Sequence, residues 1–257
     1  MTNQLSDRIN NLATSATLAM AAKARELRGE GKDVIGLSLG EPDFNTPDFI
    51  KQAAIDAVNE NYNSYTPVDG YAELKQAIIT KFKRDNDLTY EPSQIVVSTG
   101  AKQALYNLAQ VCLNPGDEVV LPCPYWVSYS DIVKLAEGVP VEVPTSIDTD
   151  FKMTPGQLRA AITPKTKWLI LNSPSNPTGF AYTHNEIKAL TEVLMKYPHI
   201  YILSDDMYEH LVYDNFEFAT GQSQIPKIST FSSGFSSDLR LELYYNTGFT
   251  QGPCYSK

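Results

Sequence analysis

Short apolar runs alternate with helix-length amphipathic segments along this chain from Val34 onward. Such alternation is typical of βαβ units, in which helices connect parallel strands and cover the sheet that the strands form. Strands are predicted at residues 94–99, 117–122, 139–143, 166–171 and 199–204. Helices are predicted at residues 47–60, 71–85, 101–112, 126–137, 155–162 and 183–196. The pattern therefore indicates an α/β protein with a mostly parallel sheet.

Polar side chains stand at the predicted ends of two successive strands. Asn176 follows the strand at 166–171, whereas Asp205 and Tyr208 follow the strand at 199–204. In an open α/β sheet, ligands bind outside the carboxyl ends of the strands. These three side chains are therefore predicted to line one ligand-binding crevice.

The C-terminal part of the chain differs in composition from the rest. Residues 228–237 (ISTFSSGFSS) are rich in serine, with glycine and threonine, which predicts a loop. Residues 239–245 (LRLELYY) alternate leucine with polar residues before two tyrosines, which predicts a half-buried strand.

The composition favours a small molecule as the partner. With 257 residues, of which 42% are hydrophobic, the chain is long enough for one large domain or two modest ones. Its net charge of −9 argues against binding to nucleic acid or to an anionic membrane, because both require a basic face. No apolar run approaches the roughly 20 residues that span a bilayer, so a soluble protein is expected.

The cysteines and histidines form no metal-binding pattern. Cys112, Cys123 and Cys254 are irregularly spaced, and the three histidines have no ligand spacing with them, so a zinc site is not expected. This cysteine usage suits a reducing compartment, and a cytoplasmic location is expected. The segment 12–22 (LATSATLAMAA) lacks a leucine run, so it is predicted to begin a helix rather than to be a signal peptide.

Two motifs lie at the predicted crevice, SPSNPTG at 173–179 and SDDMYEH at 204–210. Together with other motifs they make the chain resemble the fold type I aminotransferases that use pyridoxal 5′-phosphate (PLP), especially the bacterial aspartate aminotransferases. The resemblance runs from about Leu12 to about Thr220. Its other motifs are GLSLGEPDF (36–44), SYTPVDGYAELKQAI (64–78), STGAKQAL (98–105), NPGDEVVLPCPYWVSY (114–129) and LVYDNFEF (211–218).

The resemblance implies a three-layer αβα fold with a mostly parallel sheet, the PLP-transferase large domain, together with an incomplete small domain. Residues 1–45 match the N-terminal arm and part of the small domain, residues 46–220 match an incomplete large domain, and residues 221–257 are a divergent tail. It also implies a homodimeric enzyme that transfers the amino group between aspartate, or a similar amino acid, and 2-oxoglutarate. A generic nucleotide-binding protein is a weaker alternative, because the chain has no G-x-G-x-x-G fingerprint.

PLP requires a phosphate site, a negative partner for its pyridine nitrogen, a flat face against its ring and a lysine for its aldehyde. A helix that begins after a turn of small residues favours a phosphate, so Gly100, Ala101 and Lys102 are the candidates for that site. Read without the other motifs, this turn is an ordinary connection between strand and helix. Asp205 is the candidate partner of the pyridine nitrogen, with helix capping as its alternative role. The resemblance assigns the helix cap to Asp206 instead.

Three further side chains match cofactor-binding or substrate-binding positions of the family. Tyr208 matches the tyrosine that hydrogen-bonds the phenolic oxygen of the cofactor. Asn176 matches the asparagine that shares this oxygen and reaches the substrate carboxylate. Trp126, which follows a proline-rich loop, offers a π face to the pyridine ring and an N–H donor to the substrate carboxylate. Trp168 lies inside a predicted strand and is expected in the core.

Two more residues enter the site by resemblance alone. Gly40 matches the glycine whose backbone lies against the α-carboxylate of the substrate, where a side chain would block the approach. Tyr65 matches the tyrosine that reaches the cofactor phosphate of the neighbouring subunit. The resemblance therefore implies a homodimer with shared sites.

The Schiff-base lysine of the family has no counterpart where the resemblance would place it, because residues 236–241 read SSDLRL. Lys227 lies too early and Lys257 is the last residue, so no catalytic residue is assigned. The family's later phosphate-binding and carboxylate-binding arginines are missing as well. We expect an incomplete or frame-disrupted aminotransferase chain that is inactive by itself. The alternative is a non-catalytic remnant that binds PLP weakly or pairs with an intact paralogue.

Overall fold

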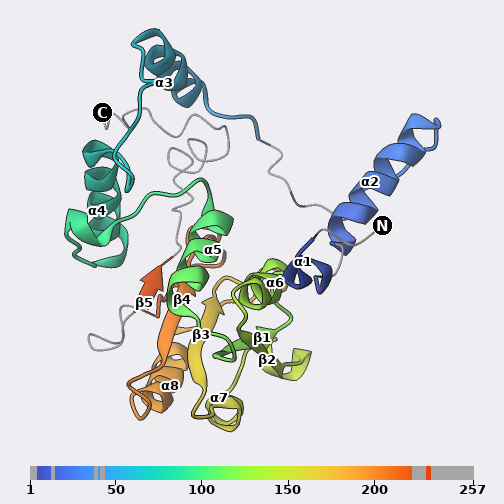
Figure 1. Cartoon of the computed structure of the whole chain (residues 1–257), viewed down its shortest axis with the longest axis vertical. Helices are drawn as coiled ribbons and strands as arrows, with labels where there is room; N and C mark the ends of the chain where they lie inside the picture. The colour runs from blue at the N-terminus through green and yellow to red at the C-terminus, as the bar shows by residue number, and fades with distance from the viewer. Residues whose placement is uncertain (1–4, 13–14, 38–39, 41–43, 222–229, 233–257) are drawn as a thin grey trace. The chain divides into compact units, whose positions relative to one another are not determined.

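The computed structural model of this chain describes all residues except 1–4, 13–14, 38–39, 41–43, 222–229 and 233–257 (Figure 1). The chain divides into two compact units, Met1–Thr46 and Pro47–Lys257. No helix in the described ranges combines the length and the apolar character needed to cross a membrane.

The first unit contains two helices, α1 (Asp7–Asn10) and α2 (Ala16–Gly29). The side chain of Ser15 caps α2 by accepting a hydrogen bond from the backbone N–H of Leu18 at 3.4 Å. The predicted helix start within residues 12–22 is therefore confirmed. After α2 the chain folds back, and the guanidinium of Arg28 donates two hydrogen bonds to the carbonyl of Val34.

The second unit is built on a parallel sheet with the strand order β2-β1-β3-β4-β5. The strands are β1 (Glu118–Cys123), β2 (Val139–Pro144), β3 (Thr166–Asn172), β4 (Tyr201–Asp205) and β5 (Thr230–Ser232). Each neighbouring pair runs parallel. The first four strands confirm the predictions at 117–122, 139–143, 166–171 and 199–204.

Helices cover both faces of this sheet, because side chains of each buried strand alternate between its two faces. On one face Leu169 and Leu171 of β3 pack with α7 (Pro155–Ala161) and α8 (His184–Leu194). On the other face Trp168 and Ile170 pack with α5 (Ala101–Cys112) and α6 (Ser128–Leu135). The three-layer αβα arrangement expected from the sequence is therefore confirmed, and Trp168 lies in the core as predicted.

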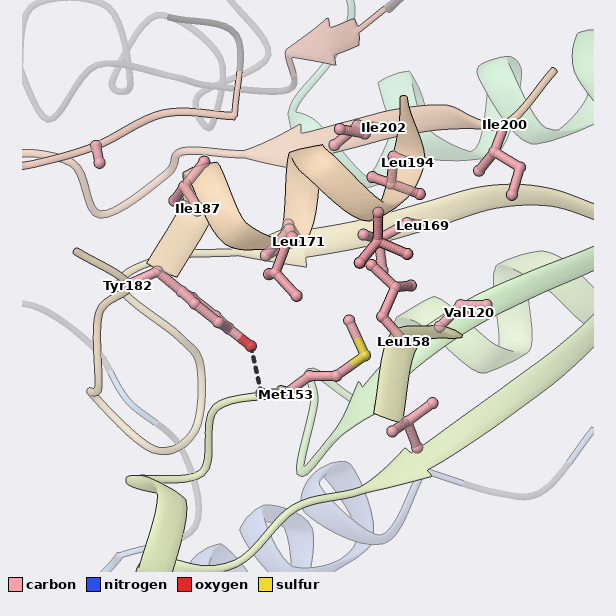
Figure 2. Close-up of a cluster of buried hydrophobic side chains, with 14 residues drawn as sticks. Val120, Met153, Leu158, Leu169, Leu171, Tyr182, Ile187, Leu194, Ile200 and Ile202 are labelled. Carbon is pink, nitrogen blue, oxygen red and sulfur yellow. Dashed lines mark hydrogen bonds between the residues drawn. The ribbon is translucent and has the colours of Figure 1, made fainter. Parts of the chain in front are cut away.

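Figure 2 shows the core cluster beneath α7 and α8, in which Val120, Leu169 and Ile202 come from three adjacent strands. The hydroxyl of Tyr182 accepts a hydrogen bond from the backbone N–H of Met153 at 2.7 Å. This bond satisfies a polar group that would otherwise be buried among apolar side chains, and it ties the start of α7 to the segment before α8.

The helix starts follow the local sequence signals. Thr154 and Thr183 form capping boxes with Gln157 and Glu186, so that backbone N–H groups at the starts of α7 and α8 have side-chain acceptors. The remaining helices of the unit are α3 (Asp48–Asn59), which begins directly after Pro47, and α4 (Ala72–Asn86). Two short 3₁₀ turns, η1 (Pro92–Gln94) and η2 (Ile147–Thr149), complete the described elements. All six predicted helices are present.

The predicted strand at 94–99 is wrong. Residue 94 ends η1, Ile95 is extended, and residues 95–98 have no assigned secondary structure and belong to no described sheet. The backbone N–H of Val97 donates to the carbonyl of Asp69 at 3.1 Å, and Val96 is largely exposed. A strand requires a neighbour to complete its ladder of hydrogen bonds, and no described strand pairs with this segment.

The predicted loop at 228–237 is also wrong in part. Residues 230–232 form β5, which pairs in parallel with β4 in the register Ile202↔Thr230, Leu203↔Phe231 and Ser204↔Ser232. The serine-rich composition suggested a loop, but the free edge of β4 provides hydrogen-bonding groups that a short extended segment can satisfy. The strand predicted at 239–245 lies outside the described residues.

Candidate functional site

The carboxyl ends of β3 and β4 bring the predicted crevice residues together. Asn172 and Asp205 are register partners at these ends, and the Asn172 side chain donates to the Asp205 carbonyl at 2.8 Å. The Asn172 amide oxygen accepts from the backbone N–H of Asn176 at 2.7 Å. The side chain of Asn176 in turn donates to the Tyr208 hydroxyl at 3.4 Å. A chain of hydrogen bonds thus joins the two loops that follow the strands.

The carboxylate of Asp205 is buried, with 5% of the residue exposed. Its Oδ2 accepts a 2.6 Å hydrogen bond from the hydroxyl of Tyr129, and its Oδ1 accepts from the backbone N–H of Met207 at 3.3 Å. Burial and the negative charge of Asp205 raise the pKa of Tyr129 well above its usual value. Tyr129 therefore keeps its proton and remains a hydrogen-bond donor to this carboxylate.

Sequence reasoning missed both Tyr129 and Asn172. Tyr129 is the last residue of the motif that contains Trp126, three residues after it, but no role was assigned to it. Asn172 is the last residue of β3, and its position beside Asp205 depends on the register between β3 and β4. A polar residue that ends a buried strand was the signal available for Asn172.

Trp126 and Lys102 lie next to one another at the starts of α6 and α5. The rings of Trp126 and Tyr129 contact edge to face, with centroids 5.4 Å apart and planes at 87°. The Nζ atom of Lys102 lies 5.1 Å from the Trp126 ring centroid, within the range of a cation–π contact. The candidate ring-facing side chain thus connects the candidate phosphate turn to the Asp205 carboxylate.

The turn at the start of α5 has the geometry of an anion site. Gly100 is the N-cap residue, with φ of +83°, a conformation that favours glycine. No side chain caps this helix. The carbonyl of Gly100 accepts the first hydrogen bonds of the helix, from the backbone N–H groups of Gln103 and Ala104. The N–H groups of Ala101 and Lys102, together with the helix dipole, can therefore bind a negative group.

Asp206 does not cap a helix, which corrects the role that the resemblance assigned to it. Residues 207–210 form turns, so no helix begins there. The carboxyl of Asp206 accepts hydrogen bonds from Ser204 at 2.7 Å and from Thr220 at 2.8 Å. Burial raises the pKa of Asp206 to about 7 despite these two bonds. Asp206 therefore ties the end of β4 to residue 220 from within the core.

Gly40 and Tyr65 are described separately from this cluster. Gly40 belongs to the first unit and is exposed. Tyr65 belongs to the second unit, and its side chain is fully exposed. The expected role of Tyr65 concerns a second subunit, so it stays a prediction. Lys227, Lys257 and residues 236–241 lie outside the described residues.

A small hollow of about 20 Å³ lies at the carboxyl ends of β1 and β3. Asn176 and Tyr129 both line it, so it borders the hydrogen-bonded cluster around Asp205. Its other lining residues are Leu121, Pro122, Pro124, Tyr125, Phe151, Lys152, Ile170, Leu171, Asn172, Ser175, Phe180 and Tyr182. The hollow lies where an α/β sheet places a ligand.

Comparison with known families identifies the chain. The sequence profile described as aminotransferase class I and II matches residues 32–236. The chain belongs to this family. Family members depend on PLP, as the sequence motifs implied.

The relatives include curated aminotransferases of bacteria. The chain is 59% identical over 216 residues to the aspartate/prephenate aminotransferase of Cereibacter sphaeroides. The aligned region covers 84% of this chain and 54% of that protein. It is 51% identical over 251 residues to a probable aspartate/prephenate aminotransferase of Rhizobium leguminosarum bv. phaseoli, covering 97% of this chain and 63% of that protein. The chain thus spans less than two thirds of either relative.

Solved structures confirm the fold. The crystal structure of the aspartate aminotransferase from Rhizobium meliloti matches with a TM-score of 0.86 at 48% identity, covering 90% of this chain and 57% of that chain. The aspartate aminotransferase of Thermus thermophilus with maleate matches with a TM-score of 0.84 at 43% identity, covering 90% of this chain and 60% of that chain.

Proposed function

We propose that this chain binds PLP at the carboxyl ends of β3 and β4. We further propose that the chain is that of an aminotransferase, which transfers the amino group between aspartate, or a similar amino acid, and 2-oxoglutarate. The observation that carries the proposal is the buried carboxylate of Asp205, held by Tyr129 and adjacent in register to Asn172. Such a carboxylate suits the protonated nitrogen of a pyridine ring, because a charge-assisted hydrogen bond is strong in a buried site.

PLP, when bound, supplies a conjugated ring that accepts the electrons of the substrate carbon–hydrogen bond. The role of Asp205 is to hold a proton on the pyridine nitrogen, which keeps the ring electron-deficient. Tyr129 keeps the Asp205 carboxylate oriented, because its raised pKa leaves it protonated and donating. The two residues together therefore supply a fixed negative charge.

The start of α5 binds the phosphate in this proposal. Gly100, Ala101 and Lys102 contribute backbone N–H groups, the helix dipole and one positive charge. Trp126 provides the flat face against the ring, and its contact with Lys102 fixes the two relative to each other. The anion site and the ring-facing side chain therefore act as one unit.

Asn176 and Tyr208 bind the phenolic oxygen of the cofactor in this proposal. Their direct hydrogen bond holds both side chains at one point of the crevice. Asn176 also reaches the substrate carboxylate. Gly40 is a further substrate-binding residue by resemblance to the family. Tyr65 contacts the cofactor phosphate of a second subunit, so we propose a homodimer. We also propose that the protein is located in the cytoplasm.

A second candidate function rests on residues 236–241 (SSDLRL), where the family has its Schiff-base lysine. Without a lysine there, this chain can hold PLP through the phosphate, ring and nitrogen contacts alone. We therefore expect this chain to bind PLP non-covalently and to catalyse no transamination. A remnant that binds PLP weakly, or pairs with an intact paralogue, is the alternative that this observation favours.

Titration of the purified chain with PLP tests the proposal, with the bound cofactor followed by absorbance and by quenching of tryptophan fluorescence. Asp205→Ala removes the partner of the pyridine nitrogen, and loss of such a bond weakens binding by roughly 10-fold or more. Asp214→Asn is the matched control, because Asp214 is exposed and its positive φ suits asparagine. Unchanged affinity in Asp205→Ala would move the site elsewhere.

A further inference from the structure

A buried ion pair joins α4 to the turn that follows β4. Lys81 and Glu209 are 5% and 3% exposed, and the Nζ of Lys81 contacts Oε1 of Glu209 across 128 positions of the sequence. Asn86 completes the group: its side-chain oxygen accepts from Lys81 at 3.0 Å, and its nitrogen donates to Oε2 of Glu209 at 2.9 Å. Both carboxylate oxygens of Glu209 are therefore held from α4.

The closed shape of this group explains why the charges can be buried. A buried charge is costly unless it is paired and hydrogen-bonded, and here each member bonds with both of the others. Apolar side chains of similar volume often replace a buried ion pair without loss of stability, so such a group is weak evidence for a stabilising role.

Glu209 follows Tyr208 directly and closes the turn that begins at Asp205. The backbone N–H of Glu209 donates to the carbonyl of Asp206 at 3.0 Å, and that of Leu211 donates to the carbonyl of Tyr208 at 2.9 Å. At the other end of the turn, Met207 donates to the Asp205 carboxylate. The turn is thus fixed to the sheet at one end and to α4 at the other.

We propose that Lys81, Asn86 and Glu209 are positioning residues that hold Tyr208 in the orientation in which it meets its ligand. This inference rests on the proposed function, in which the Tyr208 hydroxyl binds the phenolic oxygen of PLP. None of the three residues touches the ligand in this proposal. They act through the backbone of the turn, which places the Tyr208 hydroxyl beside Asn176.

The test removes the polar group while keeping the core filled. The variant Lys81→Met/Glu209→Met replaces both charges by apolar side chains of similar length, so no unpaired charge stays buried. We expect it to unfold at nearly the wild-type urea concentration. Hydrogen exchange should nevertheless become at least about tenfold faster at residues 207–211, while β3 and β4 keep their protection.

PLP titration then separates a positioning role from a merely structural one. We expect PLP affinity to fall roughly tenfold in the double variant. Adding Tyr208→Phe to the double variant should cause no further loss of PLP affinity. In the wild-type background Tyr208→Phe should weaken binding. If the double variant binds PLP like the wild type, and Tyr208→Phe has the same effect in both backgrounds, the inference is overturned.

Two further variants complete the design. Lys83→Met/Asp87→Asn removes an exposed ion pair from the same helix and should change neither exchange nor affinity. Asn86→Ala keeps the Lys81–Glu209 pair and should give the same changes as the double variant to a smaller extent, which covers a double variant that fails to fold. A wild-type chain that does not bind PLP would refute the proposed function, and the exchange at residues 207–211 would then decide this inference.

Discussion

The hydroxyl of Tyr129 donates a 2.6 Å hydrogen bond to Oδ2 of Asp205, and both residues are buried. Tyr129 lies on α6 and Asp205 ends β4, so the bond joins a helix to the central sheet. It leaves Oδ1 with a longer contact, to the backbone N–H of Met207 at 3.3 Å. The phenol of Tyr129 therefore makes the shorter of these two contacts with the carboxylate.

Removing this phenol should destabilise the chain. We expect Tyr129→Phe to lower the free energy of unfolding by about 1–3 kcal/mol, because a buried carboxylate loses a hydrogen-bond donor. Urea unfolding followed by circular dichroism measures the change. Tyr125→Phe is the matched control: its hydroxyl bonds Glu142 at an exposed position and should cost less than about 1 kcal/mol. Equal losses in the two variants would show that the Asp205 contact has no special weight.

The stability of the chain should depend on pH through Asp206. Burial raises the pKa of this carboxyl from 3.8 to about 7, so the folded state favours the protonated form. The stabilising contribution is complete below about pH 4 and is lost as the pH rises to about 7, by at most about 4 kcal/mol.

The substitution Asp206→Asn isolates this contribution, because asparagine stays neutral and can still bond with Ser204 and Thr220. We expect the variant to be more stable than the wild type at pH 8, by about 2–4 kcal/mol, and close to it at pH 4.5. Urea unfolding at the two pH values measures both differences. Asp148→Asn, at an exposed position, should show no such dependence. A gain of the same size at both pH values would contradict the assignment.

Protection from hydrogen exchange should differ between parts of the second unit. Residues 95–98 pair with no described strand, whereas β3 and β4 have a neighbour on both sides. We expect residues 94–104 to exchange much faster than residues 166–171 and 199–204, because unpaired backbone groups open readily to water. Exchange with peptide-resolved mass spectrometry measures this. Equal protection of the three segments would mean that residues 94–99 are paired in solution.

No stoichiometric covalent adduct with PLP should form on the chain as printed. The lysines that follow Asp205 are Lys227 and Lys257, and neither lies where the resemblance places the Schiff-base lysine. The measurement is incubation with PLP, reduction with borohydride and peptide mapping of pyridoxyl-lysine. A stoichiometric adduct on either residue, together with turnover of aspartate, would refute the expectation of an inactive chain.

The order of strands and helices could be predicted from the sequence, because it depends on local patterns. Apolar runs such as 166–171 are buried on both faces of the sheet, and Thr183 with Glu186 forms the capping box that their spacing indicates. The prediction failed at 94–99 and at 230–232. In both places the prediction was based on local composition, whereas a strand exists only where a neighbouring backbone pairs with it.

The amino-acid sequence by itself determined the fold class, the family motifs and the placing of Asn176, Asp205 and Tyr208 after neighbouring strands. Only the tertiary structure decided which side chains support them. Tyr129 and Asp205 are 76 positions apart, and Lys81 and Glu209 are 128 positions apart. Contacts of this kind depend on strand register and helix packing, which no local pattern encodes. The same reason explains Asp206, to which the resemblance assigned a helix cap and which burial makes part of the core.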